Sequence, residues 1–556
     1  MPLRSQARGA LARAWSAAVE AGPLPALPDT DTPPDIEIDR PSHPEHGDLS
    51  TNLAMKLARP YRQSPMTIAT AIVGQLEAAA AAGAETPIAR AEAAAPGFIN
   101  LWLAEGALAA TVDQVLAAPA EWGRVIPTAQ RSVNVEFVSA NPTGPLTIGN
   151  ARGAFVGDLL CRILEAGGQT VTREYYFNDG GAQVSNLGAS VLAVLDGSPI
   201  PEDGYHGTYV AALAGALPPK LREAARTGDS DPAEAVGRWA TDRVRQGIES
   251  SLEHLGVHFD VWKSETTLHR EGWVERAIER LREHGYVYEQ DGALWFRSTD
   301  FGDDKDRVII RSNGQPTYFA ADIGYVTEKF SRGFDHLIYI WGADHHGTVA
   351  RVRNAAQAMG YDAAAIQILL YSWVHFVRDG VEISMSKRAG EFITLDELLA
   401  EVGVDAARWF FASRAPTTGI DFDIELAKKQ SNENPVYYVQ YAHARIASIL
   451  RKAAEAGIEP APTVGALAGA PEAALARSVV RLPEVVEDAV VAEETQGVTT
   501  FATELATTFH AFYRDARVVD PDQPEVSARR LALVAATKTT IANALSLLGI
   551  SAPDSM

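Results

Sequence analysis

The segment from Val133 to Asp158 constrains this 556-residue chain most, because it joins a strand, a tight turn and a helix. Apolar residues alternate at Val133, Val135 and Phe137, a pattern that predicts a short strand. A turn rich in proline and glycine follows at 141–145, and Gly149 stands where a helix is expected to begin. A helix start offers N–H groups and a positive dipole end, and glycine lets a ligand approach the backbone. The segment therefore predicts a phosphate-binding site in an α/β sheet.

The region from about residue 130 to 415 has the alternation of an α/β domain. Such alternation predicts a doubly wound, largely parallel sheet with helices on both faces. Residues 198–231 interrupt the pattern, since they are rich in proline, glycine and acidic residues, and they are expected to belong to an insertion between the two halves of the fold. The expected strands are 133–138, 170–176, 307–311, 336–341 and 366–371.

The first 110 or so residues are predicted to form a small α+β domain. Ser64 and Pro65 have the character of an N-cap followed by proline at the first helical position. The other expected elements are helices over Arg4–Ala21 and Asp48–Arg59 and strands at Ile36–Ile38 and Phe98–Leu103. None of these residues forms a pattern typical of catalysis.

The last part of the chain, from about residue 421, is predicted to be nearly all helical. It is rich in alanine and leucine, and breaks containing proline separate its helices at 460–469 and 521–524. The predicted domains are therefore an α+β domain (1–110), an α/β domain with an insertion (111–420) and a helical bundle (421–556).

Composition limits the partners and the compartment. The formal net charge is −22, and residues 421–556 hold 12 basic and 18 acidic residues, so charge alone does not predict a nucleic-acid partner. Cys161 is the single cysteine, which excludes an intramolecular disulfide and a cysteine-rich zinc site and favours a cytoplasmic location. No apolar run approaches the roughly 20 residues that span a membrane, and the first helix lacks the apolar core of a signal peptide.

Two short motifs give the central region a family resemblance. The run Pro145-Leu146-Thr147-Ile148-Gly149-Asn150 resembles the HIGH signature of class I aminoacyl-tRNA synthetases, with Thr147 and Asn150 in place of the two histidines. The run Ser384-Met385-Ser386-Lys387-Arg388 resembles their KMSKS loop, with Ser384 in place of the first lysine. The two motifs in this order, with their flanking sequences, are similar to those of arginyl-tRNA synthetases, and the resemblance covers nearly the whole chain.

The resemblance implies a Rossmann-type catalytic domain, an N-terminal domain that contacts the outer corner of tRNA, and a C-terminal anticodon-binding bundle. It also implies ligation of arginine to tRNA(Arg): ATP and arginine form arginyl-adenylate with release of pyrophosphate, and the arginyl group then passes to the tRNA 3′-terminal ribose with release of AMP. ATP is expected to carry Mg²⁺, no metal site of the protein's own is predicted, and the chain is expected to act as a monomer.

The residues implied in the chemistry are Thr147, Asn150, Lys387 and Arg388. A hydroxyl and an amide are neutral donors, and a hydrogen bond from a charged donor is roughly twice as strong, so Lys387 and Arg388 are expected to supply the positive charge on the phosphates. Adjacent His345 and His346 lack a third ligand at suitable spacing, which favours ATP or arginine over a metal. The implied ATP site comprises Pro145, Leu146, Thr147, Gly149, Asn150, Gly342, Asp344, His345, His346, Val374, Met385, Ser386 and Lys387.

The implied arginine site is acidic, because a guanidinium is best matched by carboxylates. Glu265 lies in the stretch similar to the one whose acid holds the guanidinium. Tyr318 and Asp322 are four residues apart, so they share a helix face and are expected to stack on and pair with the same group. The α-amino and carboxylate ends of the substrate are assigned to Glu136, Ser139 and Asn141. His345 is assigned to both the arginine site and the ATP site.

Several alternatives stand beside this interpretation. The implied tRNA contacts Tyr441, His443 and Arg445 lie in an aromatic helical stripe that core packing explains equally well. Another class I synthetase is disfavoured, because a cysteine enzyme needs more cysteines and a glutamate pocket needs basic residues. A nucleotidylyltransferase leaves both flanking domains unexplained. An inactive paralogue that only binds is suggested by the missing HIGH histidines.

Overall fold

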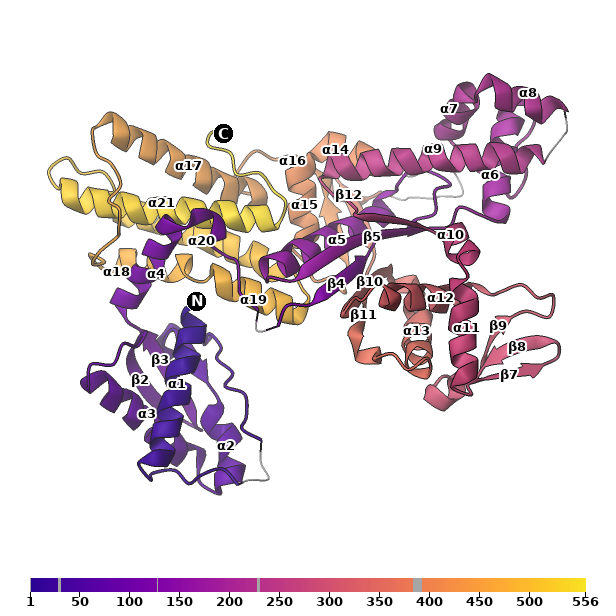
Figure 1. The fold of residues 1–556 in the computed structure, drawn as a ribbon. Helices are drawn as coiled ribbons and strands as arrows, with labels where there is room; N and C mark the ends of the chain where they lie inside the picture. Colours follow the sequence, from indigo (N-terminus) through magenta and orange to yellow (C-terminus); the bar gives the residue numbers. More distant parts are fainter. Residues whose placement is uncertain (1, 29–31, 128, 228–230, 384–392) are drawn as a thin grey trace.

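The computed structural model in Figure 1 describes residues 2–28, 32–127, 129–227, 231–383 and 393–556. At its centre is a five-stranded parallel sheet in the order β11-β10-β4-β5-β6. The chain winds outward from β4 through β5 to β6 and then returns to β10 on the other side of β4, so the switch point lies between β4 and β10. The strands are β4 (Ser132–Glu136), β5 (Thr170–Phe177), β6 (Val261–Ser264), β10 (His336–Gly342) and β11 (Ile366–Tyr371).

Helices cover both faces of this sheet, as the doubly wound prediction requires. Alternate residues of β10 enter two separate cores: Ile338 and Ile340 belong to the core that contains α5, whereas Leu337 and Tyr339 pack with α11, α12 and α13. The covering helices are α5 (Ile148–Ala166), α11 (Trp273–Glu283), α12 (Tyr318–Ser331) and α13 (His346–Ala358), and the short α10 (Glu265–Arg270) follows β6 directly. The Rossmann-type architecture predicted from sequence is confirmed.

One predicted strand of the parallel sheet is wrong. Residues 307–311 correspond to β9 (Arg307–Ile310), which pairs with β8 (Ala293–Phe296) and, through it, with β7 (Val287–Gln290) in a separate antiparallel sheet. The fifth strand of the central sheet is instead β6, which the sequence did not reveal. Each of its four residues is only partly buried, so it lacks the alternation that marks the other strands.

The insertion forms an arm of four helices that extends from the end of β5 (Figure 1). Its two long helices, α6 and α9, pack closely, and Gly188 and Gly237 stand at the contact, where an added Cβ would collide with the backbone of the opposite helix. The arm consists of α6 (Ala182–Asp196), α7 (Thr208–Ala216), α8 (Pro219–Thr227) and α9 (Pro232–Leu255).

The N-terminal region is an α+β unit, as predicted. The hydroxyl of Ser64 accepts a hydrogen bond from the N–H of Thr67 (3.1 Å), which confirms its N-cap role. The predicted strand Ile36–Ile38 is wrong, because in the described part of the region this neighbourhood contributes a single bridge, between Asp39 and Ser50. The elements are α1 (Leu3–Glu20), β1 (Leu49–Thr51), α2 (Leu53–Tyr61), α3 (Pro65–Ala81), β2 (Ile88–Ala94), β3 (Phe98–Leu103) and α4 (Glu105–Ala117), with sheet order β1-β3-β2.

A small sheet and short helices connect the region of the central parallel sheet to the C-terminal bundle. The predicted domain boundary between residues 420 and 421 falls within β14, which pairs in parallel with β12. The connecting elements are β12 (Val374–Arg378), β13 (Val381–Glu382), α14 (Leu395–Val402), α15 (Val404–Ala412), β14 (Ile420–Asp423) and α16 (Ile424–Lys428).

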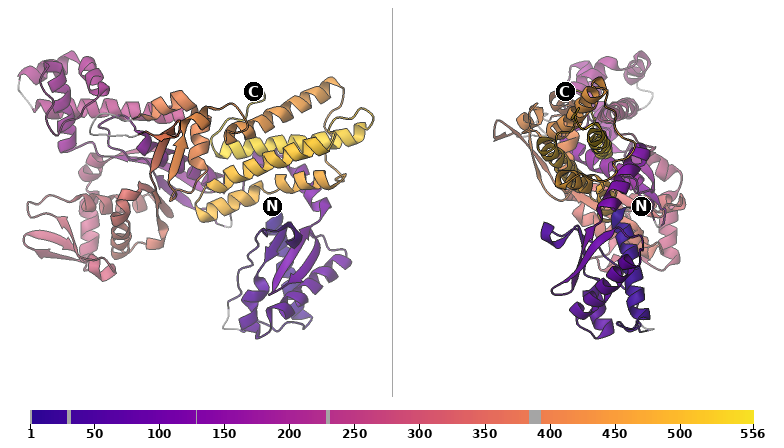
Figure 2. Two further views of the ribbon diagram at one scale, coloured as in Figure 1. Left: turned by 180° about the vertical axis from the view of Figure 1, so that it is seen from behind. Right: turned by 90° about the vertical axis from the view of Figure 1, so that its left-hand side faces the viewer.

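The C-terminal region is helical, and its long helices lie side by side in both views of Figure 2. The N-terminal unit lies against this bundle, away from the insertion arm (Figure 1). Within the described ranges, no helix has the length and apolar character needed to cross a bilayer. The bundle comprises α17 (Pro435–Glu455), α18 (Ala470–Val479), α19 (Leu482–Ala492), α20 (Gln496–Asp515) and α21 (Pro524–Leu547), with breaks where the sequence predicts them.

Candidate active site

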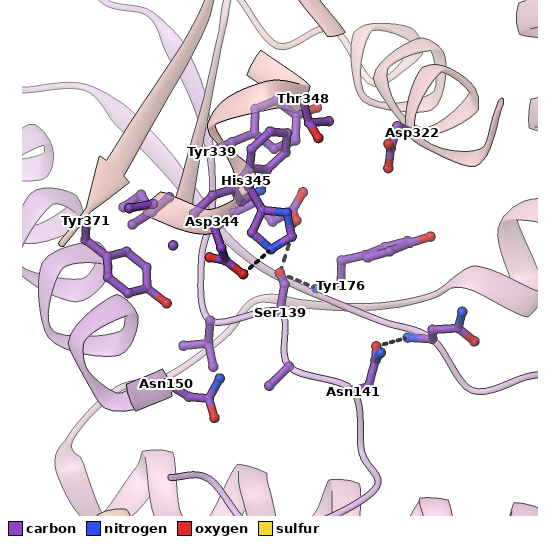
Figure 3. Close-up of a pocket in the computed structure, with 18 of the residues that line it drawn as sticks. Ser139, Asn141, Asn150, Tyr176, Asp322, Tyr339, Asp344, His345, Thr348 and Tyr371 are labelled. Carbon is purple, nitrogen blue, oxygen red and sulfur yellow. Dashed lines mark hydrogen bonds and ion pairs between the residues drawn. The ribbon is translucent and has the colours of Figure 1, made fainter. Parts of the chain in front are cut away.

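A cavity of about 870 Å³ opens at the carboxyl ends of β4 and β10, the switch point of the sheet (Figure 3). Residues from the ends of β4, β5, β10 and β11 and from the starts of α5, α10 and α12 form its wall. The cavity brings together twelve of the residues predicted from sequence: Glu136, Ser139, Asn141, Gly149, Asn150, Glu265, Tyr318, Asp322, Gly342, Asp344, His345 and Val374.

Other predicted residues lie outside this wall. Leu146 and Thr147 are buried behind it, and His346 is exposed beside it. Pro145 precedes them in the same turn and does not line the cavity. The residues Met385, Ser386, Lys387 and Arg388 lie outside the described part of the chain.

Thr147 acts on the site through Asn150. Thr147 is the N-cap of α5, and its hydroxyl donates a hydrogen bond to Oδ1 of Asn150 (2.9 Å). The hydroxyl proton is therefore directed to a side chain, and the contact of Thr147 with a phosphate stays a prediction. The bond orients Asn150 in the cavity wall and leaves its Nδ2 group as the donor at the helix start.

The chain that follows residues 384–392 lies against the start of α5, although more than two hundred residues separate the two segments. The N–H of Ile148 donates to the carbonyl of Ile393 (3.2 Å), and the N–H of Leu395 donates to the carbonyl of Leu146 (2.9 Å). On the other side of residues 384–392, the N–H of Ile383 donates to the carbonyl of Phe376 in β12 (2.8 Å). These bonds anchor the chain on both sides of residues 384–392. The segment that follows them, 393–395, is bound to the start of α5.

Two acids of the cavity are poised for a cation. Burial, together with the charges of Glu136 and Glu265, raises the pKa of Asp322 to about 8. Burial also raises the pKa of Glu265, although the hydroxyl of Tyr176 hydrogen-bonds it. Burial, together with the Glu265 charge, raises the pKa of the Tyr176 phenol in turn. An entering cation would offset the repulsion between these carboxylates, so the cavity favours a positively charged ligand.

Glu136 differs from the other two acids, because it has an internal counter-charge. Its Oε2 lies 2.6 Å from Nζ of Lys329, and its Oε1 accepts a hydrogen bond from the hydroxyl of Ser139 (3.1 Å). Both charged side chains are almost completely buried. The carboxylate among the three residues assigned to the substrate's amino and carboxylate ends is thus already paired, whereas Ser139 is half-buried and Asn141 exposed in the cavity wall.

The turn after β4 is strained where it borders the cavity. Val138 has φ of 65° and Ser139 has φ of 43°, both in the left-handed region. A β-branched residue there is an outlier, and such conformations cost about 1–3 kcal/mol each, so the surroundings must hold them. Two contacts with β5 do so: the hydroxyl oxygen of Ser139 accepts from the N–H of Tyr176 (3.2 Å), and Tyr175 hydrogen-bonds both backbone groups of Ala140.

Arg152 fixes the opposite wall. Its buried guanidinium donates to four backbone carbonyls, those of Ser372 (2.8 Å), Trp373 (3.0 Å), Ala415 (3.1 Å) and Thr418 (2.6 Å). Burial lowers the pKa of Arg152 to about 10. The side chain ties α5 to the connection between β11 and β12, which carries Tyr371, Trp373 and Val374 into the cavity wall.

Sequence reasoning missed the aromatic part of the wall. Tyr371 and Trp373 follow the carboxyl end of β11, and the rule that ligands bind at such ends would have selected them. Tyr176, at the end of β5, falls under the same rule. No sequence signal marks Thr348, because it lies within a helix. The missed wall residues include Tyr176, Asn178, Tyr339, Thr348, Tyr371 and Trp373.

The part of the cavity wall that follows β10 carries exposed polar groups. Nε2 of His345 lies 3.7 Å from a carboxylate oxygen of Asp344, and both side chains are exposed (Figure 3). Across the described ranges, no group of three or more His, Cys, Asp or Glu side chains could hold a metal ion.

The predicted tRNA contacts divide into surface and core. Tyr441 is 37% exposed, and the Arg445 guanidinium lies 4.4 Å from the ring centroid of Tyr513. His443 is only 4% exposed, and its Nδ1 hydrogen-bonds the carbonyl of Pro553 (2.8 Å). Burial of this kind favours core packing over a tRNA contact for His443. Tyr441 and Arg445 keep accessible aromatic and cationic groups.

The parallel sheet, the cavity at its switch point and the run of residues 145–150 at the start of α5 place the chain among the class I aminoacyl-tRNA synthetases. Residues 111–196 and 227–416 match the family model described as "tRNA synthetases class I (R), catalytic domain". Residues 5–103 match "Arginyl tRNA synthetase N terminal domain", and residues 439–556 match "DALR anticodon binding domain".

Relatives of similar length share this organisation. The chain is 45% identical over 532 residues to "Arginine--tRNA ligase" of Citrifermentans bemidjiense, covering 94% of this chain and 95% of the relative. It is 42% identical over 533 residues to the protein of that name in Bacillus subtilis, covering 94% and 95%. The Thermus thermophilus arginyl-tRNA synthetase structure shares the fold, with a TM-score of 0.75, 24% identity and coverage of 99% and 100%. The chain belongs to the arginyl-tRNA synthetase family.

Proposed function

We propose that this chain ligates arginine to its cognate tRNA in two ATP-dependent steps. The observation that carries the proposal is the pair Glu265 and Asp322, two partly buried acids with raised pKa values at the edge of the nucleotide-binding sheet. A guanidinium is a planar fork of donors that matches carboxylates, and its charge offsets the repulsion between them. Tyr318, exposed on the same wall, supplies an aromatic face for the same group.

The first step is attack of the arginine carboxylate on the α-phosphate of ATP, which forms arginyl-adenylate and displaces pyrophosphate. No protein nucleophile is required, so the side chains act by positioning and by charge stabilisation. Ser139 and Asn141 hold the amino and carboxylate ends of arginine. The side-chain amide of Asn150 and the backbone N–H of Gly149 donate to phosphate oxygens, and the missing side chain of Gly149 leaves the approach open.

Positive charge on the phosphates comes from Lys387 and Arg388, with His345 at the other side. The hydrogen bond between Ile148 and Ile393 supports this assignment, because it ties the chain after the Lys387 motif to the start of α5. Mg²⁺ enters with ATP, since this ion is usually held by substrate phosphates and one or two carboxylates, and Asp344 is suitably exposed.

In the second step the terminal ribose hydroxyl of tRNA attacks the adenylate carbonyl, and AMP leaves. Tyr441 and Arg445 contribute to the tRNA surface of the helical bundle, and the N-terminal unit contacts the outer corner of the tRNA. The chain acts as a monomer in the cytoplasm, where its single buried cysteine needs no oxidising environment.

A charging assay with arginine and citrulline tests the proposal. Citrulline has nearly the shape of arginine but a neutral urea group, so a pocket built on two carboxylates should reject it by at least about 10³-fold in kcat/KM. ATP–pyrophosphate exchange in the presence of tRNA(Arg) measures the first step, and tRNA charging measures the second. Equal use of both amino acids would contradict the acidic pocket, and no exchange with any amino acid would identify an inactive paralogue.

A further inference from the structure

Lys329 is a buried cation directly beneath the candidate active site. Its side chain is 0% exposed, although lysine at the end of a helix is normally solvated. Nζ lies 2.6 Å from Oε2 of Glu136, 4.0 Å from the ring centroid of Tyr339 and 4.4 Å from that of Tyr325. Glu136, Tyr325 and Tyr339 all line the cavity, so Lys329 contacts three wall residues from behind.

The effect of Lys329 reaches the cavity through Glu136. With Oε2 held by Lys329, Oε1 of Glu136 is directed at the hydroxyl of Ser139, which donates to it at 3.1 Å. The same hydroxyl oxygen accepts from Tyr176, and Val138 and Ser139 are in the left-handed region. A turn of this kind keeps its shape only if its neighbours fix it. The ion pair is one of these constraints.

Lys329 also sets the charge that faces a substrate. Glu136, Glu265 and Asp322 all border the cavity, and the Glu136 charge contributes to the high pKa of Asp322. A cation on the protein side of Glu136 compensates that one carboxylate and leaves the other two for the ligand. If Lys329 were absent, a third uncompensated acid would lie next to the strained turn.

We propose that Lys329 is a positioning residue for arginine, which fixes the orientation of Glu136 and thereby the Val138–Ser139 turn that receives the amino and carboxylate ends of the substrate. This inference rests on the proposed function. Lys329 touches neither arginine nor ATP, so its effect should be selective for the substrate end that Ser139 contacts.

The decisive variant is Lys329→Met, which keeps the length of the side chain and removes its charge. In ATP–pyrophosphate exchange with saturating tRNA, the KM for arginine should rise at least tenfold, whereas the KM for ATP should stay within twofold. The control is Lys538→Met in α21, where a lysine also pairs with an acid, Asp554, at 2.7 Å but lines no part of the cavity. Equal changes in both KM values, or none, would overturn the proposal.

A second variant covers the case in which the unpaired Glu136 prevents folding. Lys329→Met combined with Glu136→Gln buries no charge and should melt near the wild-type temperature. If the pair only compensates charge, this double variant should recover the wild-type KM for arginine, and that result would refute a positioning role. We expect the KM to stay at least fivefold raised, because nothing then orients residue 136.

A mutant cycle that includes Ser139→Ala tests whether Lys329 affects arginine binding through Ser139. If Lys329 and Glu136 act through Ser139, adding Ser139→Ala to the double variant should change the KM for arginine by less than twofold, although Ser139→Ala alone raises it. Additive effects would show that Lys329 does not act through this turn. Failure of the wild-type enzyme to use arginine would instead refute the proposed function, so the two failures are distinct.

Discussion

At the scale of single residues, the ionisation of Asp322 links pH to substrate binding. Its pKa of about 8 means that the carboxyl is largely protonated at pH 6 and ionised at pH 9. Arginine should bind the ionised form, so its dissociation constant should increase roughly tenfold per pH unit below 8. Calorimetry at pH 7 in two buffers of different ionisation enthalpy should show release of nearly one proton.

The variant Asp322→Asn separates this effect from the general pH dependence of the protein. It removes one charge partner of the guanidinium, so arginine binding should weaken far more than ATP binding, and proton release should fall sharply. A dissociation constant that keeps the wild-type pH dependence in this variant would assign the titration to another group.

The same carboxyl should lower stability at high pH. Its pKa is raised in the folded state, so the folded protein binds the proton more tightly than the unfolded chain. Its contribution to stability is present below the unfolded pKa, near 4, and is lost as pH rises through 8. Asp322→Asn should therefore raise the melting temperature relative to wild type more at pH 8.5 than at pH 5. An equal gain at both values would contradict the shifted pKa.

At the scale of elements, the insertion arm depends on the close approach of α6 and α9. A Cβ at Gly237 would collide with the backbone of Val184, whereas a Cβ at Gly247 in the same helix would meet nothing within 4 Å. Gly237→Ala should lower the free energy of unfolding of the arm by about 1–3 kcal/mol, and its matched control Gly247→Ala should raise it by up to about 1 kcal/mol. Hydrogen exchange of α6 amides measures both, and similar effects of the two would disprove the packing argument.

A charge-removing substitution in the segment after β13 should lower the rate of adenylate formation without changing the affinity for arginine. Lys387→Ala removes the side-chain charge that would stabilise the leaving pyrophosphate. Single-turnover adenylate formation should therefore slow by about 10²-fold or more, which is the usual effect of removing one donor that stabilises a transition state. The dissociation constant for arginine should stay nearly constant, because Glu265 and Asp322 are untouched. An unchanged rate would remove this segment from the mechanism.

How far sequence predicts these elements depends on what each one buries. The strands β4, β10 and β11 carry apolar patterns because helices cover them, and β5 ends in a run of aromatic residues; all four were predicted. The strand β6 is only partly buried and carries no such pattern. In the site, Glu265 and Asp322 followed from family motifs, but Lys329 did not. Its burial depends on a partner 193 residues away, and no local pattern encodes that.

At the scale of the whole molecule, ion pairs dock the N-terminal unit on the helical bundle. Arg4 pairs with Glu487 (2.8 Å) and with Asp488 (2.6 Å), and Arg477 of the bundle pairs with Asp48 (2.9 Å). Surface pairs contribute little to stability, but truncating one partner of a buried pair is costly because a charge is left unpaired. These contacts hold two proposed tRNA-binding regions in one arrangement, so their loss should appear in tRNA binding.

The pair between Arg40 and Glu484 gives the sharpest test of this docking. Arg40 donates from two nitrogens to one oxygen of Glu484 (3.0 and 2.8 Å), whose side chain is only 4% exposed. Arg40→Met leaves the Glu484 carboxylate without this partner at the interface, so the N-terminal unit should detach more readily. The KM for tRNA(Arg) should rise about three- to tenfold, since roughly 1 kcal/mol of binding corresponds to a fivefold change, while the KM for arginine stays within twofold.

Arg90→Met is the matched control, because Arg90 pairs with Glu92 on the exposed face of β2 and does not reach the bundle. Small-angle scattering of the free proteins should show a larger radius of gyration for Arg40→Met alone. Displacement of the unit without a change in the KM for tRNA would separate docking from tRNA recognition. A higher KM for arginine would instead indicate that the contact stabilises the catalytic domain, because α19, which carries Glu484, also packs against α5.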